Sequence, residues 1–231
     1  MGLNCYLAMT ATEFSKADPL PPSVAWMACH FSCYGLGLSN LPPKLPTGSL
    51  VILNDRTPIS GHDPVLIRRQ LESLGQIGGI LLDLQRKNDR ETASLVKELT
   101  AAPPWPVAVT EWYAGDIDCP VFLSAPPLHK SLAAHIAPWE GREIWLEAAT
   151  ELQTVTVTQQ GSTFKTGPVQ SVQEPAFEEE TLHMRYHLAV TQQAAVFTMV
   201  REISHVKALL AEAEELGITK AVGLYQQLRA L

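Results

Sequence analysis

Short apolar runs recur along the chain and alternate with segments of helix-like pattern. The clearest run, Ile77 to Leu84, holds apolar residues and glycines apart from Asp83, and the charged pair Arg86-Lys87 bounds it. A run this short predicts a strand that is buried on both faces. Helix-like segments at 64–74 and 89–99 flank it, which is typical of an α/β protein. Asp83 then lies at the carboxyl end of its strand, where α/β folds place their chemistry.

Eight runs of this kind occur, and we expect each of them to form a strand. They span residues 24–33, 49–54, 79–84, 105–112, 119–124, 143–148, 194–200 and 218–225. Eight buried strands in one domain predict a closed, TIM-like (β/α)8 barrel. Several connections are too short for a full helix, so we expect a shortened barrel. An open α/β sheet is the alternative, since strand order cannot be taken from the runs alone.

The pattern changes at about residues 151–190. Residues 153–165 alternate and carry a Gln-Gln-Gly-Ser turn, which predicts an antiparallel hairpin. Residues 168–180 are polar and acidic, as in a surface loop, and residues 183–189 alternate again, as in an extension of the hairpin sheet. An amphipathic helix closed by Gly217 follows at 203–216. We therefore expect a single barrel domain, residues 1–231, with a late β-hairpin insertion.

Composition excludes several classes of partner. The chain has a net charge of −7 and no basic stripe, so we expect no nucleic-acid partner. No apolar run approaches the roughly 18 residues of a membrane span, so we expect no membrane partner. Residues 1–17 lack a positive region ahead of their apolar residues, which argues against a signal peptide and favours a cytoplasmic protein. The oligomeric state stays open.

Cysteine and histidine spacing predicts neither a metal nor a cofactor. Cys29 and Cys33 are four residues apart, but no second pair completes a zinc pattern, so we expect free thiols whose redox role stays open. His183 and His187 are also four apart, but they lie in a strand-like stretch, where this spacing does not form a helical metal clamp. No dinucleotide, phosphate-loop or Gly-x-Ser-x-Gly motif is present.

The segment Gly78-Gly79-Ile80-Leu81-Leu82-Asp83-Leu84-Gln85 resembles the signature strand of the family-18 glycoside hydrolases, Asp-Gly-x-Asp-x-Asp-x-Glu. Gly79 and Asp83 match that pattern, whereas Gly78, Leu81 and Gln85 depart from it. The end of the chain, 197–225, is similar to the last strand–helix–strand unit of those barrels, and the hairpin region resembles their late β insertion. The resemblance implies a TIM barrel and a sugar site. It argues against the family's reaction, because Gln85 cannot donate a proton as the catalytic Glu does.

If the strands close into a barrel, the residues that follow them surround one mouth. Polar groups mixed with aromatic rings are typical of a carbohydrate site, although strand ends are polar in any soluble barrel. Tyr225 would take the place of the Trp that the family often has at the end of its last strand. The predicted ring consists of His30, Tyr34, Asn54, Asp55, Asp83, Gln85, Glu111, Trp112, Ser124, His129, Glu147, Arg201, Tyr225 and Gln226.

Three carboxyl groups are candidates for catalysis. Asp83 is costly to bury unless it is paired, so it either binds a ligand or forms a hydrogen bond or an ion pair within the mouth. In the family that the chain resembles, the equivalent aspartate helps the substrate's acetamido group act as the nucleophile. Glu111 and Glu147 each end a predicted strand, and either is a candidate for a relocated general acid.

Three functions follow from these observations. The first is a chitinase-like barrel that binds a glycan or another small molecule and has little or no hydrolytic activity, because the family's acid is lost. The second is a glycoside hydrolase that uses Glu111 or Glu147 as its acid. The third is a structural protein whose barrel mouth is plugged, for instance by the segment 168–180.

Overall fold

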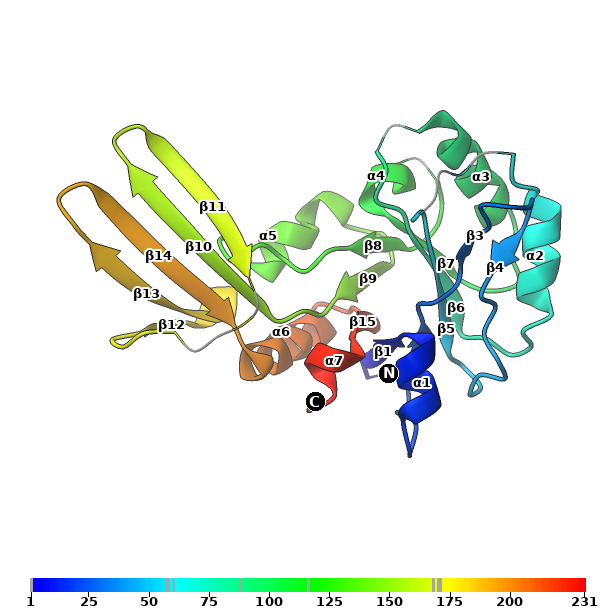
Figure 1. The fold of residues 1–231 in the computed structure, drawn as a ribbon, viewed down its shortest axis with the longest axis horizontal. Helices are drawn as coiled ribbons and strands as arrows, with labels where there is room; N and C mark the ends of the chain where they lie inside the picture. Colours follow the sequence, from blue (N-terminus) through cyan, green and yellow to red (C-terminus); the bar gives the residue numbers. More distant parts are fainter. Residues whose placement is uncertain are drawn as a thin grey trace.

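The computed structural model describes residues 2–56, 59, 61–87, 89–115, 117–167, 169 and 172–231. Within them, eight parallel strands pair side by side, and the pairing of β2 with β5 closes them into a barrel. The predicted shortened TIM-like barrel is therefore confirmed (Figure 1). Its strands, in order around the barrel, are β1 (Asn4–Met9), β2 (Val24–Trp26), β5 (Leu50–Asn54), β6 (Gly79–Asp83), β7 (Val107–Thr110), β8 (Val121–Leu123), β9 (Ile144–Glu147) and β15 (Lys220–Leu224).

The helices around the barrel are few and mostly short. Between β2 and β5 the chain forms a small hairpin, β3 (His30–Phe31) and β4 (Leu38–Ser39), in place of a helix. Asp63 caps helix α2 and Asp89 caps α3, each by accepting a backbone N–H bond. The helices are α1 (Ala11–Lys16), α2 (Pro64–Glu72), α3 (Arg90–Thr100), α4 (Glu111–Ala114), α5 (Leu132–Ile136) with the 3₁₀ turn η1 (Ala137–Trp139), α6 (Ile203–Glu215) and α7 (Tyr225–Leu228).

Two of the strand assignments were wrong. One barrel strand was missed and one run was wrongly assigned to the barrel, so the predicted number of barrel strands is still correct. The first barrel strand is β1, which lies in a segment that we did not predict as a strand. The run at 194–200 is not a barrel strand, because it forms β14 (Ala194–Arg201) in a separate antiparallel sheet. An apolar run shows that a strand meets apolar neighbours, but it does not show which sheet supplies them.

The antiparallel sheet has five strands and lies between β9 and α6 in the chain. In Figure 1 it projects away from the barrel beyond α5. It contains the predicted hairpin, β10 with β11, and the predicted extension, β13. The strands, in sheet order, are β11 (Gly161–Gly167), β10 (Glu151–Thr158), β14, β13 (Met184–Val190) and β12 (Phe177–Glu179), and the 3₁₀ turn η2 (Glu180–Leu182) joins the last two.

One face of this sheet is apolar. The register aligns Phe164, Val155, Phe197 and Leu188 across β11, β10, β14 and β13. At the base of the sheet Met184 and Met199 pack on Leu128, from the loop after β8. Further along the strands, Val157, Phe164 and Val190 are exposed. The sheet is therefore covered at its base and open toward its tip.

The barrel interior is filled by alternate residues of the eight strands. They are mostly small or aliphatic, with three aromatic rings: Tyr6, Ala8, Ala25, Leu50, Ile52, Leu81, Ala108, Phe122, Trp145 and Val222. The largest of them, Trp145, is fully buried. Phe122, on the neighbouring strand β8, pairs in register with Trp145 on β9.

Packing explains the double glycine before β6. A Cβ atom on Gly79 would lie 2.8 Å from Cη2 of Trp145, and the φ angle of Gly79 is +154°. A Cβ atom on Gly78 would lie 2.2 Å from the carbonyl oxygen of Gly48. Position 78 therefore has no room for the aspartate that stands there in the family-18 motif.

None of the described helices combines the length and the apolar character that crossing a bilayer requires.

Candidate functional site

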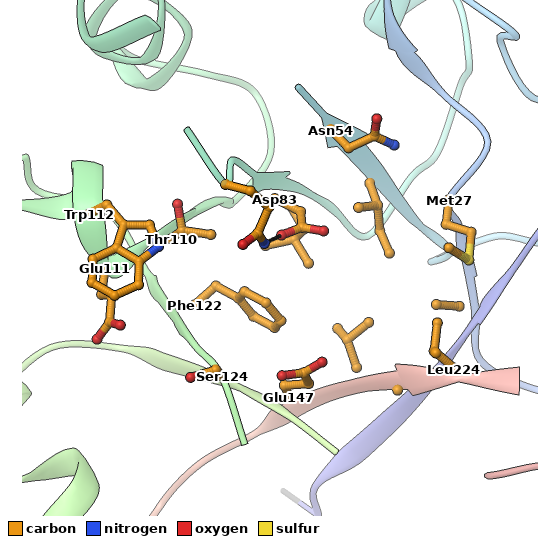
Figure 2. A pocket seen from close by; sticks show the side chains of 16 residues that line it. Met27, Asn54, Asp83, Thr110, Glu111, Trp112, Phe122, Ser124, Glu147 and Leu224 are labelled. Carbon is orange, nitrogen blue, oxygen red and sulfur yellow. Dashed lines mark hydrogen bonds between the residues drawn. The ribbon is translucent and has the colours of Figure 1, made fainter. Parts of the chain in front are cut away.

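A cavity of about 190 Å³ opens at the carboxyl ends of the barrel strands. Its floor is apolar, with Ile52, Leu81, Phe122 and Val222 from the interior layer. Above that floor lies a ring of mostly polar side chains. Each of them comes two residues after a side chain of the barrel interior. Because side chains alternate along a strand, these residues also point into the barrel. The ring consists of Asn54, Asp83, Thr110, Ser124, Glu147 and Leu224 (Figure 2).

Asp83, the last residue of β6, accepts a hydrogen bond of 2.6 Å from Nε2 of Gln85 to its Oδ1. Burial raises the pKa of Asp83, the hydrogen bond from Gln85 partly offsets this, and the charge of Asp55 raises it further. The net effect is a pKa above the usual value of an aspartate. Gln85, which stands where the family motif has its acid, therefore serves here as a hydrogen-bond donor to the neighbouring aspartate.

Glu147, the last residue of β9, also points into the cavity (Figure 2). Its Oε2 accepts a hydrogen bond of 3.1 Å from the backbone N–H of Ala125. Burial raises the pKa of Glu147, that bond partly offsets the effect, and the charges of Asp83 and Glu151 raise it further. The charge of Asp83 thus raises the pKa of Glu147 across one cavity, and both groups favour the protonated form more than an exposed carboxyl does.

Glu111 and Trp112 follow β7 as the first residues of α4 and line the edge of the cavity. In Figure 2 the Glu111 carboxyl group lies on the side of Trp112, apart from Asp83 and Glu147. The side chain of Trp112 is 46% exposed, and the Nζ of Lys87 lies 3.2 Å from the centroid of its ring. Trp112 therefore presents an aromatic ring at the rim, with a cation in contact with it.

Seven of the predicted ring residues do not line this cavity, so the expectation that they face the same mouth is not met: His30, Tyr34, Asp55, His129, Arg201, Tyr225 and Gln226. His30 lies in β3 and contacts Nδ2 of Asn40, and Tyr34, in the β3–β4 loop, is 97% exposed. Tyr225 begins α7 and borders a separate groove with Gln226. The carboxylate of Asp55 accepts bonds from the backbone N–H groups of Gln85 and Arg86, at 3.0 and 2.8 Å, and so braces the loop after β6.

Arg201 and the segment 168–180 also lie away from the cavity. Arg201 is fully buried and donates to the carbonyl oxygens of Pro126, Leu182 and His183. It ties the five-stranded sheet to the loop after β8. In the 168–180 segment, residues 168, 170 and 171 lie outside the described part of the chain, and its β12 pairs with β13. None of the segment's described residues lines the cavity.

Sequence reasoning missed some residues that line the cavity. Thr110 takes the inward position at the end of β7, and its Oγ1 donates to the carbonyl oxygen of Leu84. Met27 and Leu224 line the apolar side. The alternation of side chains could have found them, because Thr110 and Leu224 lie two residues after the interior positions Ala108 and Val222.

The four cysteines have free thiols, and no three His, Cys, Asp or Glu side chains of the described residues are grouped as a metal site would require. Burial raises the pKa of Cys29 to about 12 and that of Cys5 to about 11. Thiols with such pKa values are poor nucleophiles, since the thiolate is the reactive form. The chemistry of the site therefore rests on its carboxyl, amide and hydroxyl groups.

No protein-family model matches the chain, and no curated protein sequence does. Among solved structures, the Bacillus cereus spore cortex-lytic enzyme SleL is similar, with a TM-score of 0.50 at 10% sequence identity, over 96% of this chain and 70% of that one. The sporulation-specific glycosylase ydhD from Bacillus subtilis gives a TM-score of 0.46 at 11% identity, over 75% of this chain and 79% of that one. The first likeness extends over nearly the whole chain, so this protein has a barrel fold of the kind found in a spore cortex-lytic enzyme.

Proposed function

We propose that this protein is a carbohydrate-active barrel that cleaves a glycan, with Asp83 and Glu147 as its carboxyl pair. The observation that carries the proposal is the position of these two groups. Both line one cavity at the carboxyl ends of the strands, and burial together with a neighbouring negative charge raises both pKa values, the charge being that of Asp55 for Asp83 and those of Asp83 and Glu151 for Glu147. Perturbed carboxyl groups that share a cavity are typical of acid–base sites.

The surroundings of the two carboxyls support different roles for them. Each carboxylate accepts one hydrogen bond that favours its ionised form, Asp83 from Gln85 and Glu147 from the backbone N–H of Ala125. Two charges, of Asp83 and Glu151, raise the pKa of Glu147, whereas one, of Asp55, raises that of Asp83. Glu147 is therefore the better proton donor to the leaving glycosidic oxygen. Asp83 as a carboxylate would stabilise the positive charge that develops on the sugar or activate the water that adds to it.

The other lining residues suit a sugar. Asn54, Thr110 and Ser124 supply amide and hydroxyl groups, and Trp112 offers an exposed aromatic ring at the rim. At about 190 Å³ the cavity is smaller than the roughly 300–1,000 Å³ of sites for drug-sized ligands, so it would hold one sugar ring with the rest of the chain outside. The resemblance to family-18 glycoside hydrolases and the fold shared with a cortex-lytic enzyme support a glycan as the ligand.

The test is turnover of a glycan panel that includes chito-oligosaccharides, glycan strands of bacterial cell walls and phosphorylated sugars. Glu147→Gln and Asp83→Asn should each lower kcat by about 10²–10⁴-fold, the contribution expected of a general acid or base. Glu111→Gln is the matched control and should keep most of the activity. Turnover that survives both substitutions in the pair would contradict the proposal, and loss in Glu111→Gln alone would assign the acid to Glu111.

A second candidate function is glycan binding without hydrolysis. The observation that favours it is the hydrogen bond from Gln85 to Asp83, because the family's acid position is here an amide that holds the aspartate in place. A bound glycan at a hundred times its Kd should stabilise the fold by about 2.7 kcal/mol. Thermal unfolding with the panel measures this directly. A shift without turnover, abolished by Asp83→Ala, would favour binding over cleavage.

A further inference from the structure

Three basic residues lie one or two positions after cavity-lining residues in the chain. Arg56 lies two positions after Asn54, and Arg86 and Lys87 come directly after Gln85. All three are exposed, and among the described residues none of them forms an ion pair within 4.0 Å. The chain as a whole is acidic, with 24 Asp and Glu against 17 Lys and Arg. These three cations lie on the loops that follow the neighbouring strands β5 and β6, and we call them the basic rim.

Hydrogen bonds fix part of the backbone of this basic rim. Asp55 accepts from the N–H groups of both Gln85 and Arg86, which joins the loop after β5 to the loop after β6. The Tyr113 hydroxyl, from α4, donates to the carbonyl oxygen of Arg86 and accepts from the N–H of Asp89. A site on fixed loops loses less conformational entropy when it binds a ligand.

Two of the nearby acids, Asp55 and Asp89, accept hydrogen bonds from groups outside the basic rim's side chains. Both oxygens of Asp55 accept the backbone N–H bonds just described, and Asp89 caps α3 with bonds from the N–H of Glu91 and the hydroxyl of Thr92. Glu111 forms no ion pair within 4.0 Å with a described residue. The charges of the basic rim are therefore available to a ligand.

Lys87 connects the basic rim to the cavity. Its ammonium lies 3.2 Å from the ring centroid of Trp112, which lines the cavity and is exposed to solvent. A sugar against this ring would bring its substituents beside the ammonium. Ammonium and guanidinium groups bind carboxylate and phosphate oxygens through strong, charge-assisted hydrogen bonds.

We propose that the basic rim of Arg56, Arg86 and Lys87 selects glycans that carry an anionic group on the sugar beside the ring held in the cavity. The inference rests on the proposed function, because it names the substrate class of the same site. The two carboxyls inside the cavity act on the glycosidic bond, and the basic rim outside binds the anion. A neutral glycan would use the cavity alone.

Calorimetric titration tests the proposal with three oligosaccharides of equal length: one neutral, one with a carboxylate on one ring and one with a phosphate there. The native protein should bind at least one anionic form about tenfold more tightly than the neutral one, since one charge-assisted hydrogen bond supplies that much. The triple variant Arg56→Gln, Arg86→Gln, Lys87→Met should lose this preference and should still bind the neutral glycan. Lys207→Met, on the exposed face of α6, is the matched control and should change neither affinity.

Equal affinity for the neutral and anionic glycans, or a preference that survives the triple variant, would overturn the selection of anions and leave the proposed function standing. Which anionic form binds more tightly identifies carboxylate or phosphate as the recognised group. Raised salt should weaken binding of the anionic glycan more than that of the neutral one, because exposed charges are screened. If no glycan binds the native protein, the proposed function fails, and the role of the basic rim fails with it.

Discussion

The barrel and the five-stranded sheet use β-structure in opposite ways. The residues of β7 and β8 are buried without exception, and the interior is filled by Trp145 and its neighbours. In the antiparallel sheet, every residue of β11 is exposed and the apolar face is covered only at its base. The barrel therefore has a core of its own, whereas the sheet depends on contacts with the barrel for much of its stability.

This difference in packing also bears on which of the two regions holds the candidate site. Asp83 and Glu147 lie on top of a rigid, packed interior, which can hold their geometry and exclude water from one side. The described sheet residues do not line the cavity. Four predictions test whether stability and proton chemistry are properties of the barrel, with the sheet attached to it.

Trp145→Ala should have the largest effect. The side chain is fully buried in the barrel interior, so its loss leaves a large cavity and should lower the free energy of unfolding by about 3–5 kcal/mol. Phe164→Ala, on the sheet at 61% exposure, is the matched control and should cost less than about 1 kcal/mol. Urea denaturation measures both. Similar losses at the two positions would show that the sheet is as tightly packed as the barrel.

Arg201→Met should detach the sheet from the barrel. The substitution keeps an apolar stem but removes the donors to Pro126, Leu182 and His183, and unpaired buried carbonyls should cost about 3 kcal/mol. Limited proteolysis should then cut within residues 149–202 while the rest resists. Arg185→Met removes only ion pairs to exposed glutamates and should cost about 0–1 kcal/mol. Equal protease resistance of both variants would exclude this role of Arg201.

Gly78→Ala should cost about 1–3 kcal/mol, because the new Cβ would overlap the backbone of Gly48 and force a shift at the amino end of the barrel. Gly35→Ala is a control, since its Cβ would meet only Oγ of Ser32 at 3.6 Å, an ordinary contact. Thermal unfolding gives the comparison. A Gly78→Ala protein as stable as the native one would mean that packing does not account for this departure from the family motif.

The smallest expected effect is that of pH on the stability of the fold, and we attribute it to the two carboxyl groups of the barrel. The pKa values of Asp83 and Glu147 are raised in the folded state, so these two groups bind more protons in the folded protein than in the unfolded chain once the pH reaches the ordinary carboxyl range. Stability should therefore decline as the pH rises from the ordinary carboxyl range through the raised values. Asp83→Asn with Glu147→Gln should flatten that decline in unfolding curves recorded between pH 4 and pH 8. An unchanged decline would mean that other groups cause it.

Much of the fold could be predicted from local pattern. Short buried runs such as Leu50–Asn54 and Gly79–Asp83, separated by capped helices, are sufficient to indicate parallel strands and a barrel of this size. The alternation in 153–165 and 183–189 indicated antiparallel strands, and these are β10, β11 and β13. Both patterns follow from which side chains are buried, which is a local property of the sequence.

The site was predictable in part, and Tyr225 shows one cause of the misses. Asn54, Asp83, Glu147 and Ser124 were chosen as strand ends and also have the inward side-chain direction. Tyr225 was chosen by the same rule, but it lies one residue after the inward Leu224 and falls on α7. A shift of one residue turns a side chain to the other face of a strand, so the position of a strand end must be known to within a single residue.

The sequence by itself determined most of the strands, the caps and the carboxyl groups, because each depends on residues close together in the chain. Only the tertiary structure decided that Asn4–Met9 is a barrel strand, that the run at 194–200 belongs to the outer sheet, and that Asp55 braces a loop. It also brought Asp83 and Glu147, 64 positions apart in the chain, to one cavity. Such pairings depend on strand order and register, which are set by packing between distant segments and leave no mark on a short run of residues.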